Sequence, residues 1–163
     1  MSVADERTDL ETTGAGDIRP GEQGVALPAA FDAGVYFIGR IRTPFKTRAQ
    51  CPRRGDAEEG PVCTIDLDPR WAAALEGVAQ NTHLQVLYWM DQARRDLVLQ
   101  SPRRDGTVTG TFAIRSPVRP NPIASSVVRL IGVEGTRVQV RGLDCLDGTP
   151  LVDLKPERCP HGE

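Results

Sequence analysis

The chain has 163 residues, of which 39% are hydrophobic, and a formal net charge of −2 at pH 7. This size and composition predict a globular protein with one main domain and a sizeable core. No apolar run approaches the roughly 20 residues that cross a bilayer, and the acidic N-terminus lacks the basic and then apolar order of a signal peptide. We therefore expect a cytoplasmic protein without a membrane segment.

Charge is distributed unevenly along the chain. Residues 1–34 carry seven acidic residues against two arginines, a net charge of −5, whereas residues 35–163 carry 15 acidic and 18 basic residues, a net charge of +3. The first 33 residues show no hydrophobic period, so we expect an acidic disordered tail over 1–33. Many of the remaining bases gather within 40–54 and 103–119, and they are mostly arginine, whose planar fork suits phosphate or carboxylate.

Strand-forming segments follow from residue 35 onward. Runs rich in β-branched and aromatic residues, bounded by Pro, Gly, Asn or Asp, are typical of strands. These runs cover Val35–Ile41, Val62–Leu67, Thr82–Met90, Asp96–Pro102, Gly106–Ile114, Val127–Val133, Arg137–Leu143 and Thr149–Pro156.

One short helix interrupts the strands. Asp68 is a favourable N-cap and Pro69 suits the first helical position, so a helix is predicted to run from there to near Gly77. Six or seven strands drawn from these eight runs, with one short helix, predict a mainly β fold, a small antiparallel β-barrel over residues 34–157, because closure removes exposed strand edges. Residues 158–163 are expected to form a short C-terminal tail.

Several common kinds of site lack their sequence signals. Four cysteines show no CxxC pair, and only two histidines are present, so we expect reduced thiols and no metal site. No GxSxG elbow, dinucleotide-binding fingerprint or P-loop is present. A nucleotide would have to be bound in another way.

Three polar blocks lie at predicted strand ends: CPRR at 51–54, RSPVRPNPI at 115–123 and GLDCLDGTPLVDLKP at 142–156. The prolines of the second block cannot lie inside a strand, because they lack the amide hydrogen that a sheet needs. A stiff loop of this kind holds an arginine or an amide in place at little entropic cost. In the third block, an ordinary turn in which Asp147 caps its own backbone is the alternative to a site.

Taken in order, the segments IGRIRTPFKTR, CPR, THLQVLYW, GTFAIRSPVRPNPI, SVVRLIGVEG and GLDCLDGTPLVDLKP resemble the TrmO family, whose members are also called YaeB-like or TsaA-like proteins. The resemblance runs from about Ile38 to Pro156, and its signature, RSPxRPNPI followed by LDxxDGTPxxDxKP, is long and unusual. It implies a small β-barrel methyltransferase that uses S-adenosyl-L-methionine and works as a homodimer. The implied substrate is threonylcarbamoyladenosine beside the anticodon of tRNA, which is methylated at N6.

The resemblance also implies roles for single residues. The residues placed in catalysis are Asp147, His83 and Asn121. Asp147, Asp144 and His83 are the candidate proton acceptors, since the N6 nitrogen must lose a proton, and Asn121 is expected to hydrogen-bond the threonylcarbamoyl group or the adenine edge. Arg119, Lys155 and Arg103 are expected to contact tRNA. The residues expected to bind the cofactor are Pro52, Arg53, Arg54, Met90, Asp91, Arg115, Ser125, Leu143, Asp144 and Cys145.

The chain also departs from the family pattern. Family members usually carry the segment SHLWLLFWFH where this chain carries THLQVLYWMD, so that Gln85 replaces Trp and Asp91 replaces His. In addition, Ala124 follows RPNPI in place of Gly. Many bacterial members carry a further domain after the barrel. If that domain binds tRNA in those proteins, this chain is expected to bind tRNA differently or to methylate another substrate. Two alternatives therefore stay open: a methyltransferase of another small substrate, or a barrel that binds the cofactor or RNA without catalysis.

Overall fold

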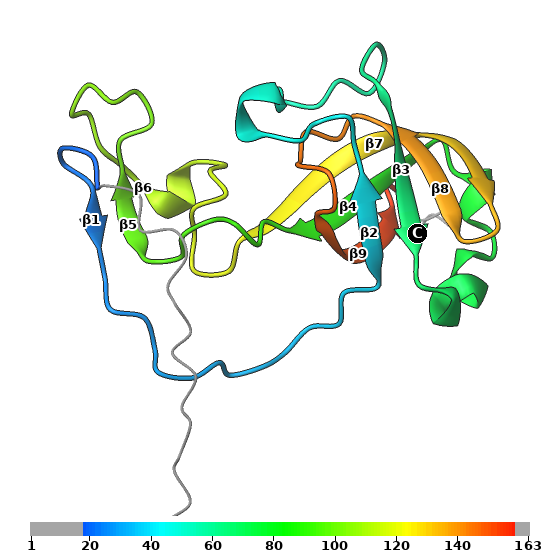
Figure 1. Ribbon diagram of the computed structural model, residues 1–163, viewed down its shortest axis with the longest axis horizontal. Helices are drawn as coiled ribbons and strands as arrows, with labels where there is room; N and C mark the ends of the chain where they lie inside the picture. Colours follow the sequence, from blue (N-terminus) through cyan, green and yellow to red (C-terminus); the bar gives the residue numbers. More distant parts are fainter. Residues whose placement is uncertain (1–17, 159–163) are drawn as a thin grey trace, which may run out of the picture. The chain divides into compact units, whose positions relative to one another are not determined.

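The structure is a computed structural model that describes residues 18–158 (Figure 1). The chain divides into two compact units. The barrel unit comprises Leu27–Asp91 and the chain from Asn121 onward. The small-sheet unit comprises the chain up to Ala26 together with Gln92–Pro120. The segment expected as one domain, 34–157, therefore contains the barrel and also the part of the small-sheet unit at 92–120.

The barrel unit is a closed barrel of antiparallel strands, which confirms the predicted fold class (Figure 1). Closure pairs every strand on both sides, so no strand edge is left open. In barrel order the strands are β2 (Gly39–Arg42), β3 (Val62–Leu67), β8 (Arg137–Arg141), β7 (Ile123–Glu134), β4 (His83–Trp89) and β9 (Pro150–Pro156).

The barrel core follows from alternation along the strands. In β4, Leu84, Val86 and Tyr88 are buried, while the residues between them are half-buried. Alternate side chains of a strand point to opposite faces, so one set fills the barrel interior. The interior also contains Ile41, Cys63, Ile65, Leu67, Val128, Val138, Val140, Leu143, Cys145 and Leu151.

The predicted helix is present as a 3₁₀ helix, η2 (Pro69–Leu75). As expected, the Asp68 side chain accepts a hydrogen bond from the backbone N–H of Arg70, and Gly77 adopts a left-handed conformation with φ of 79°. Only Leu75 of this segment is buried, so little packing favours a longer α-helix. The other 3₁₀ segments within residues 18–158 are η1 (Arg48–Gln50), η3 (Val78–Gln80) and η4 (Thr111–Ala113).

The small-sheet unit contains three short antiparallel strands: β1 (Gln23–Gly24), β5 (Leu97–Gln100) and β6 (Thr109–Gly110). Two corrections follow. The segments predicted as strands over 96–102 and 106–114 belong to this sheet and not to the barrel. The expected disordered tail contains a strand, because β1 pairs with β5 and Glu22 accepts hydrogen bonds from the backbone N–H groups of Arg19 and Ser101.

The strand predicted over 35–41 is shorter than expected, since β2 begins at Gly39. Val35 and Tyr36 are exposed, and their β-forming character finds no partner strand there. The described cysteines Cys51, Cys63 and Cys145 are free thiols, in line with the expectation. Residues 1–17 and 159–163, including most of the expected C-terminal tail, lie outside the described residues. Within the described part, no helix has the length and apolar character that a membrane span requires.

Candidate functional site

Two of the three polar blocks lie together at one end of the barrel. A Cβ atom added to Gly55 would clash with the carbonyl oxygen of Gly142, so the two backbones are in direct contact. Gly142 itself has φ of 111°, a conformation that favours glycine. The loop carrying Pro52, Arg53 and Arg54 therefore packs on the backbone that leads directly into Asp144. All three loop residues are exposed.

Asp144 is the acidic centre of this end of the barrel. It is half-buried, and its Oδ1 accepts a hydrogen bond of 2.7 Å from the hydroxyl of Tyr88. The same hydroxyl lies 2.8 Å from Oγ of Ser126. Asp144 Oδ2 makes no hydrogen bond within residues 18–158. One carboxylate oxygen is thus held by the barrel interior and the other is available to a ligand.

Cys51 lies close enough to Asp144 to sense its charge. Burial raises the pKa of the Cys51 thiol, and the negative charge of Asp144 raises it further. The Cys51 thiol also lies 3.6 Å from the carbonyl oxygen of Thr47. Burial and the neighbouring carboxylate therefore both favour the neutral thiol form of Cys51 over the thiolate.

Leu143 and Cys145, both expected to bind the cofactor, have their side chains in the barrel core. They are 1% and 0% exposed, and burial raises the pKa of Cys145 to about 12. The Thr43 hydroxyl donates a hydrogen bond of 2.9 Å to the carbonyl oxygen of Cys145. Their side chains therefore anchor the backbone on both sides of Asp144, and only their backbone atoms are available to a ligand.

Asp147 holds the turn of the third block to β2. Its carboxylate accepts hydrogen bonds from Lys46 Nζ at 2.6 Å and from the backbone N–H of Thr43 at 3.2 Å. The hydrogen bond from Lys46 keeps the pKa of Asp147 below its ordinary value. A carboxylate engaged in this way is a weak proton acceptor, so the geometry favours the turn alternative over the catalytic role expected for Asp147.

His83 and Lys155 lie away from Asp144. His83 begins β4, five residues before Tyr88, which corresponds to about 16 Å at roughly 3.3 Å per residue. Its side chain is directed to the opposite face of the strand from Tyr88, and it contacts Thr82. Lys155 pairs in register with Gln85 and forms an ion pair of 2.9 Å with Asp153. The structure does not bring these two residues to the Asp144 site.

The beginning of β7 lies at the same barrel end as Tyr88. Ala124 pairs with Tyr88, and the backbone N–H of Met90 donates to the carbonyl oxygen of Pro122 at 2.8 Å. Asp91 and Asn121, which flank this contact, are exposed.

Ser125 is the residue expected to offer backbone contacts to the cofactor just beyond the proline loop. Its hydroxyl lies on the outer face of the barrel, where it accepts a hydrogen bond of 3.0 Å from Gln85. The neighbouring Ser126 is the serine that faces Tyr88.

The remaining predicted residues, Arg103, Arg115 and Arg119, belong to the small-sheet unit. Arg119 Nη1 donates hydrogen bonds to the carbonyl oxygens of Ile114 and Ser116, at 3.1 and 2.9 Å. Buried Gln100 donates from Nε2 to the carbonyl oxygen of Val118 at 2.7 Å. The Arg119 side chain therefore stabilises the proline loop by hydrogen bonds to the loop's own backbone. Arg103 and Arg115 are exposed.

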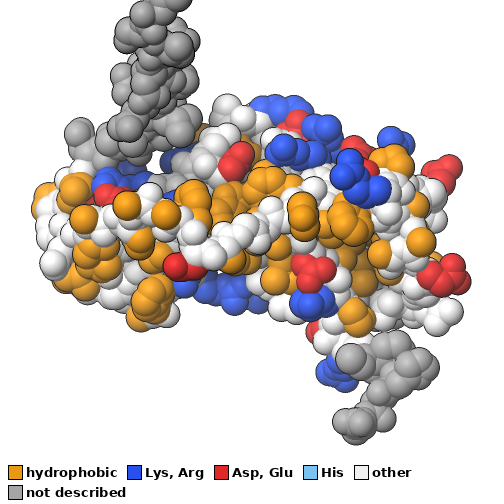
Figure 2. Space-filling model, turned by 90° about the horizontal axis from the view of Figure 1, so that it is seen from below, with side chains coloured by type: hydrophobic (Ala, Val, Ile, Leu, Met, Phe, Trp, Pro, Cys, Tyr) orange, Lys and Arg blue, Asp and Glu red, His pale blue; other side chains and the backbone are white. Residues whose placement is uncertain are grey.

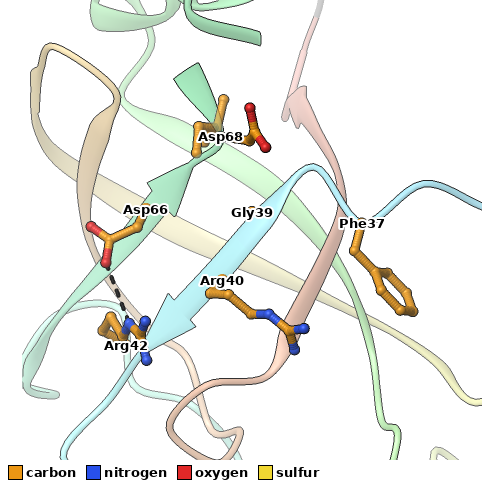
Figure 3. Close-up of a pocket in the computed structure, with 7 residues that line it drawn as sticks. Phe37, Gly39, Arg40, Arg42, Asp66 and Asp68 are labelled. Carbon is orange, nitrogen blue, oxygen red and sulfur yellow. Dashed lines mark hydrogen bonds and ion pairs between the residues drawn. The ribbon is translucent and has the colours of Figure 1, made fainter. Parts of the chain in front are cut away.

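A hollow of about 270 Å³ lies on the outer face of β2 and β3 (Figure 3). Its lining includes Phe37, Arg40 and the ion pair between Arg42 and Asp66. In this pair, Arg42 Nε lies 3.3 Å from Asp66 Oδ2. A second hollow of about 380 Å³ includes Leu84 and Lys155 in its lining and so lies toward the His83 end of β4. Neither lining includes Asp144.

Hydrophobic, basic and acidic side chains alternate over the face shown in Figure 2. Among residues 18–158, no three His, Cys, Asp or Glu side chains are grouped so that they could hold a metal ion.

Sequence reasoning missed Tyr88 and Ser126 as residues of the site. Alternation along β4 could have indicated that Tyr88 faces the interior with Leu84 and Val86. The hydroxyl of an inward-facing tyrosine requires a partner. Nothing in the sequence indicates that this partner is Asp144, which lies 56 residues later.

Comparison with known proteins identifies relatives of this chain. The family model for the tRNA-methyltransferase O N-terminal domain matches residues 40–158. A protein of Rhizobium radiobacter named probable S-adenosyl-L-methionine-binding protein VirR is 51% identical over 141 residues, which cover 86% of this chain and 80% of that protein. A Pseudomonas aeruginosa protein named putative S-adenosylmethionine-dependent methyltransferase RcsF is 40% identical over 125 residues, covering 73% of this chain and 54% of that protein.

A solved structure, TrmO from Pseudomonas aeruginosa, has the same fold. It matches with a TM-score of 0.64 and 34% sequence identity, covering 82% of this chain and 61% of that chain. The present chain thus spans less than two thirds of that protein.

Proposed function

Because the chain belongs to the tRNA-methyltransferase O N-terminal domain family, we propose that it binds S-adenosyl-L-methionine beside Asp144 and transfers the methyl group to a nucleophile. The observation that carries this proposal is the Asp144 carboxylate. It is half-buried, one oxygen is held by Tyr88, and the other has no hydrogen-bond partner within residues 18–158.

The residues at this end of the barrel fit the cofactor. S-adenosyl-L-methionine carries a positive sulfonium, an ammonium group and a ribose diol, and a carboxylate oxygen suits each of them. The cofactor's own carboxylate suits an arginine fork, which Arg53 or Arg54 would supply from the loop packed on Gly142. Leu143 and Cys145 would contribute backbone groups, since their side chains are buried.

When bound, the cofactor supplies an electrophilic methyl group. The contribution of the chain is to bind and orient it, because alignment of the reacting atoms supplies much of the rate of such a displacement. Asp147 is engaged by Lys46 and Thr43, and His83 lies at the other end of β4. We therefore assign neither residue the role of proton acceptor.

For the methyl acceptor we propose tRNA, at N6 of threonylcarbamoyladenosine next to the anticodon. The description of the matching family and the solved TrmO structures support this choice. Exposed Arg40, Arg48, Arg53 and Arg54 add basic groups to the barrel that suit phosphate contacts. A barrel that binds the cofactor without catalysis is the second candidate, supported by relatives named only as binding proteins.

We also propose a homodimer. Ile123, Val127 and Ile131 are 42, 48 and 43% exposed, and they lie four residues apart on the outer face of β7. An apolar stripe of this kind is typical of a protein contact surface. Light scattering at micromolar concentration should give twice the chain mass. The Val127→Glu variant should give a mass closer to that of the monomer. A monomeric wild-type protein would exclude this assembly.

The cofactor proposal is tested by calorimetry on the full chain. Asp144→Asn should weaken S-adenosyl-L-methionine binding by about 10- to 100-fold, because a hydrogen bond to a charged group contributes roughly 1.5–3 kcal/mol. Asp32→Asn, a change at an exposed aspartate of the same unit, is the matched control and should leave the affinity unchanged. Equal affinities for Asp144→Asn and wild type would remove Asp144 from the site.

The acceptor is tested with S-adenosyl-L-methionine labelled in the methyl group. Incubation with tRNA that contains threonylcarbamoyladenosine, followed by nucleoside mass spectrometry, should show the label on that nucleoside. Label found on other nucleosides or small molecules would indicate another substrate. Cofactor binding without any transfer would favour the non-catalytic barrel.

A further inference from the structure

The Tyr88 hydroxyl lies inside the barrel between two polar side chains. Tyr88 is 2% exposed, and its oxygen is 2.7 Å from Asp144 Oδ1 and 2.8 Å from Ser126 Oγ. A phenol has one hydrogen to donate, and an ionised carboxylate can only accept. Tyr88 therefore donates to Asp144, and Ser126 donates to the oxygen of Tyr88. The three side chains form a directed relay that ends on the carboxylate.

The hydrogen that is donated to Asp144 is held on Tyr88. Burial raises the pKa of Tyr88 well above its ordinary value, and the charge of Asp144 raises it further. Tyr88 consequently keeps its hydrogen. The ring itself is held by the core, where Tyr88 packs with Leu143 and Cys145 in one apolar cluster.

The backbone of Asp144 is fixed independently of Tyr88. Leu143 and Cys145 are buried on either side of it, and Thr43 holds the carbonyl oxygen of Cys145. The freedom that is left to Asp144 is rotation of its carboxylate about the side-chain bonds. The hydrogen bond from Tyr88 restricts that rotation, and it leaves Oδ2 as the oxygen without a partner within residues 18–158.

We propose that Tyr88, oriented by Ser126, is a positioning residue that holds the Asp144 carboxylate with its second oxygen toward the positively charged or hydroxyl groups of S-adenosyl-L-methionine. This inference rests on the proposed function. A carboxylate that is held in place before the ligand arrives loses less side-chain entropy on binding, so part of the cofactor affinity derives from a side chain that does not touch the cofactor.

The test uses Tyr88→Phe, which removes the hydroxyl and keeps the ring, with Tyr36→Phe as the matched control because Tyr36 is 83% exposed. Calorimetry on the full chain should show S-adenosyl-L-methionine binding about tenfold weaker for Tyr88→Phe and unchanged for Tyr36→Phe. Ser126→Ala, which leaves Tyr88 in place, should weaken binding by about two- to threefold. Wild-type affinity in both Tyr88→Phe and Ser126→Ala would overturn the inference.

A double-mutant cycle separates positioning from a merely structural role. If Tyr88 acts through Asp144, Tyr88→Phe should have no further effect on cofactor affinity in an Asp144→Asn background. A structural role would instead give the same fold-loss in both backgrounds, and that result would overturn the inference. If the wild-type protein binds no S-adenosyl-L-methionine, the proposed function is wrong. If the wild-type protein binds it and Tyr88→Phe binds it equally well, only this inference is wrong.

The same variants report which cofactor group faces Asp144. S-adenosyl-L-homocysteine lacks the positive sulfonium and keeps the ammonium and the ribose. A loss in Tyr88→Phe that is confined to S-adenosyl-L-methionine would support a carboxylate directed at the sulfonium. An equal loss for both ligands would support one directed at the ammonium or the ribose.

Discussion

The barrel unit and the small-sheet unit differ in what fills their interiors. In the barrel, almost all fully buried side chains are apolar, and they converge from all six strands on one core. In the described part of the small-sheet unit, Leu97 is a buried apolar residue, but Gln100, Ser101 and Thr111 are buried as well. The first unit is stabilised by non-directional burial and the second by directional hydrogen bonds.

This difference bears on the proline loop, which carries the most recognisable motif of the chain. Residues 115–120 belong to the small-sheet unit and are held by Gln100, Arg119 and Arg95 through carbonyl oxygens. A segment with few apolar contacts opens locally at a lower free energy than a barrel core does. We therefore expect the motif loop to exchange its amide hydrogens faster than β3, β4 or β8.

The largest effect should come from the barrel core. Ile65 is 0% exposed, and Ile65→Ala should lower the free energy of unfolding by about 2–5 kcal/mol through lost burial and the cavity left behind. Chemical denaturation should show one cooperative unfolding transition for the barrel. A change below about 1 kcal/mol would contradict a core held together by apolar packing.

The next largest effect should come from a backbone contact at the barrel end. Gly55→Ala places a Cβ atom against the carbonyl oxygen of Gly142, so the loop of residues 51–54 must move away. We expect a loss of about 1–3 kcal/mol in stability. Weaker S-adenosyl-L-methionine binding should accompany it, as measured by denaturation and calorimetry. Gly34→Ala, which meets no atom within 4 Å, is the control.

Disruption of the polar interior should act locally. Gln100→Ala removes the donors to Thr111 Oγ1 and to the carbonyl oxygen of Val118, at 2.8 and 2.7 Å. The small-sheet unit should lose about 1–3 kcal/mol. Hydrogen exchange should accelerate over residues 97–120 and stay unchanged in β4 and β8.

Ser101→Ala is the contrasting change in the same interior. The Ser101 hydroxyl is buried and has no hydrogen-bond partner within residues 18–158. Its removal should leave stability unchanged or raise it slightly, because no bond is lost. If both variants destabilise the unit equally, its polar side chains do not act through the hydrogen bonds described.

Among the changes that remove a described interaction, the smallest loss of stability should come from the ion pair between Lys46 and Asp147. The hydrogen bond from Lys46 lowers the pKa of Asp147 below its ordinary value of 3.8, so the folded state favours the ionised form. That contribution is present at pH 7 and is lost as the pH falls below about 4. Both side chains are partly exposed, so Asp147→Asn should cost only about 0.2–1 kcal/mol at pH 7. Melting curves at pH 7 and 3 should show the difference shrinking at the lower pH.

The sequence by itself determined the features that depend on neighbouring residues. The apolar centre of the segment 82–90 predicted a buried strand, and the pair Asp68 and Pro69 predicted the start of a helical segment. The motif blocks predicted the family, which the comparison confirmed. These signals are local because side-chain period and capping involve only a few consecutive residues.

The tertiary structure alone decided which distant groups meet. Gln23 pairs with Leu99, which turned part of an expected tail into a strand. Asp147 bonds to Lys46, 101 residues away, which favours a structural role over a catalytic one. Tyr88 meets Asp144 across the barrel interior. Each partner follows from the barrel register and from the pairing of the small sheet, and composition and periodicity carry no information about long-range register.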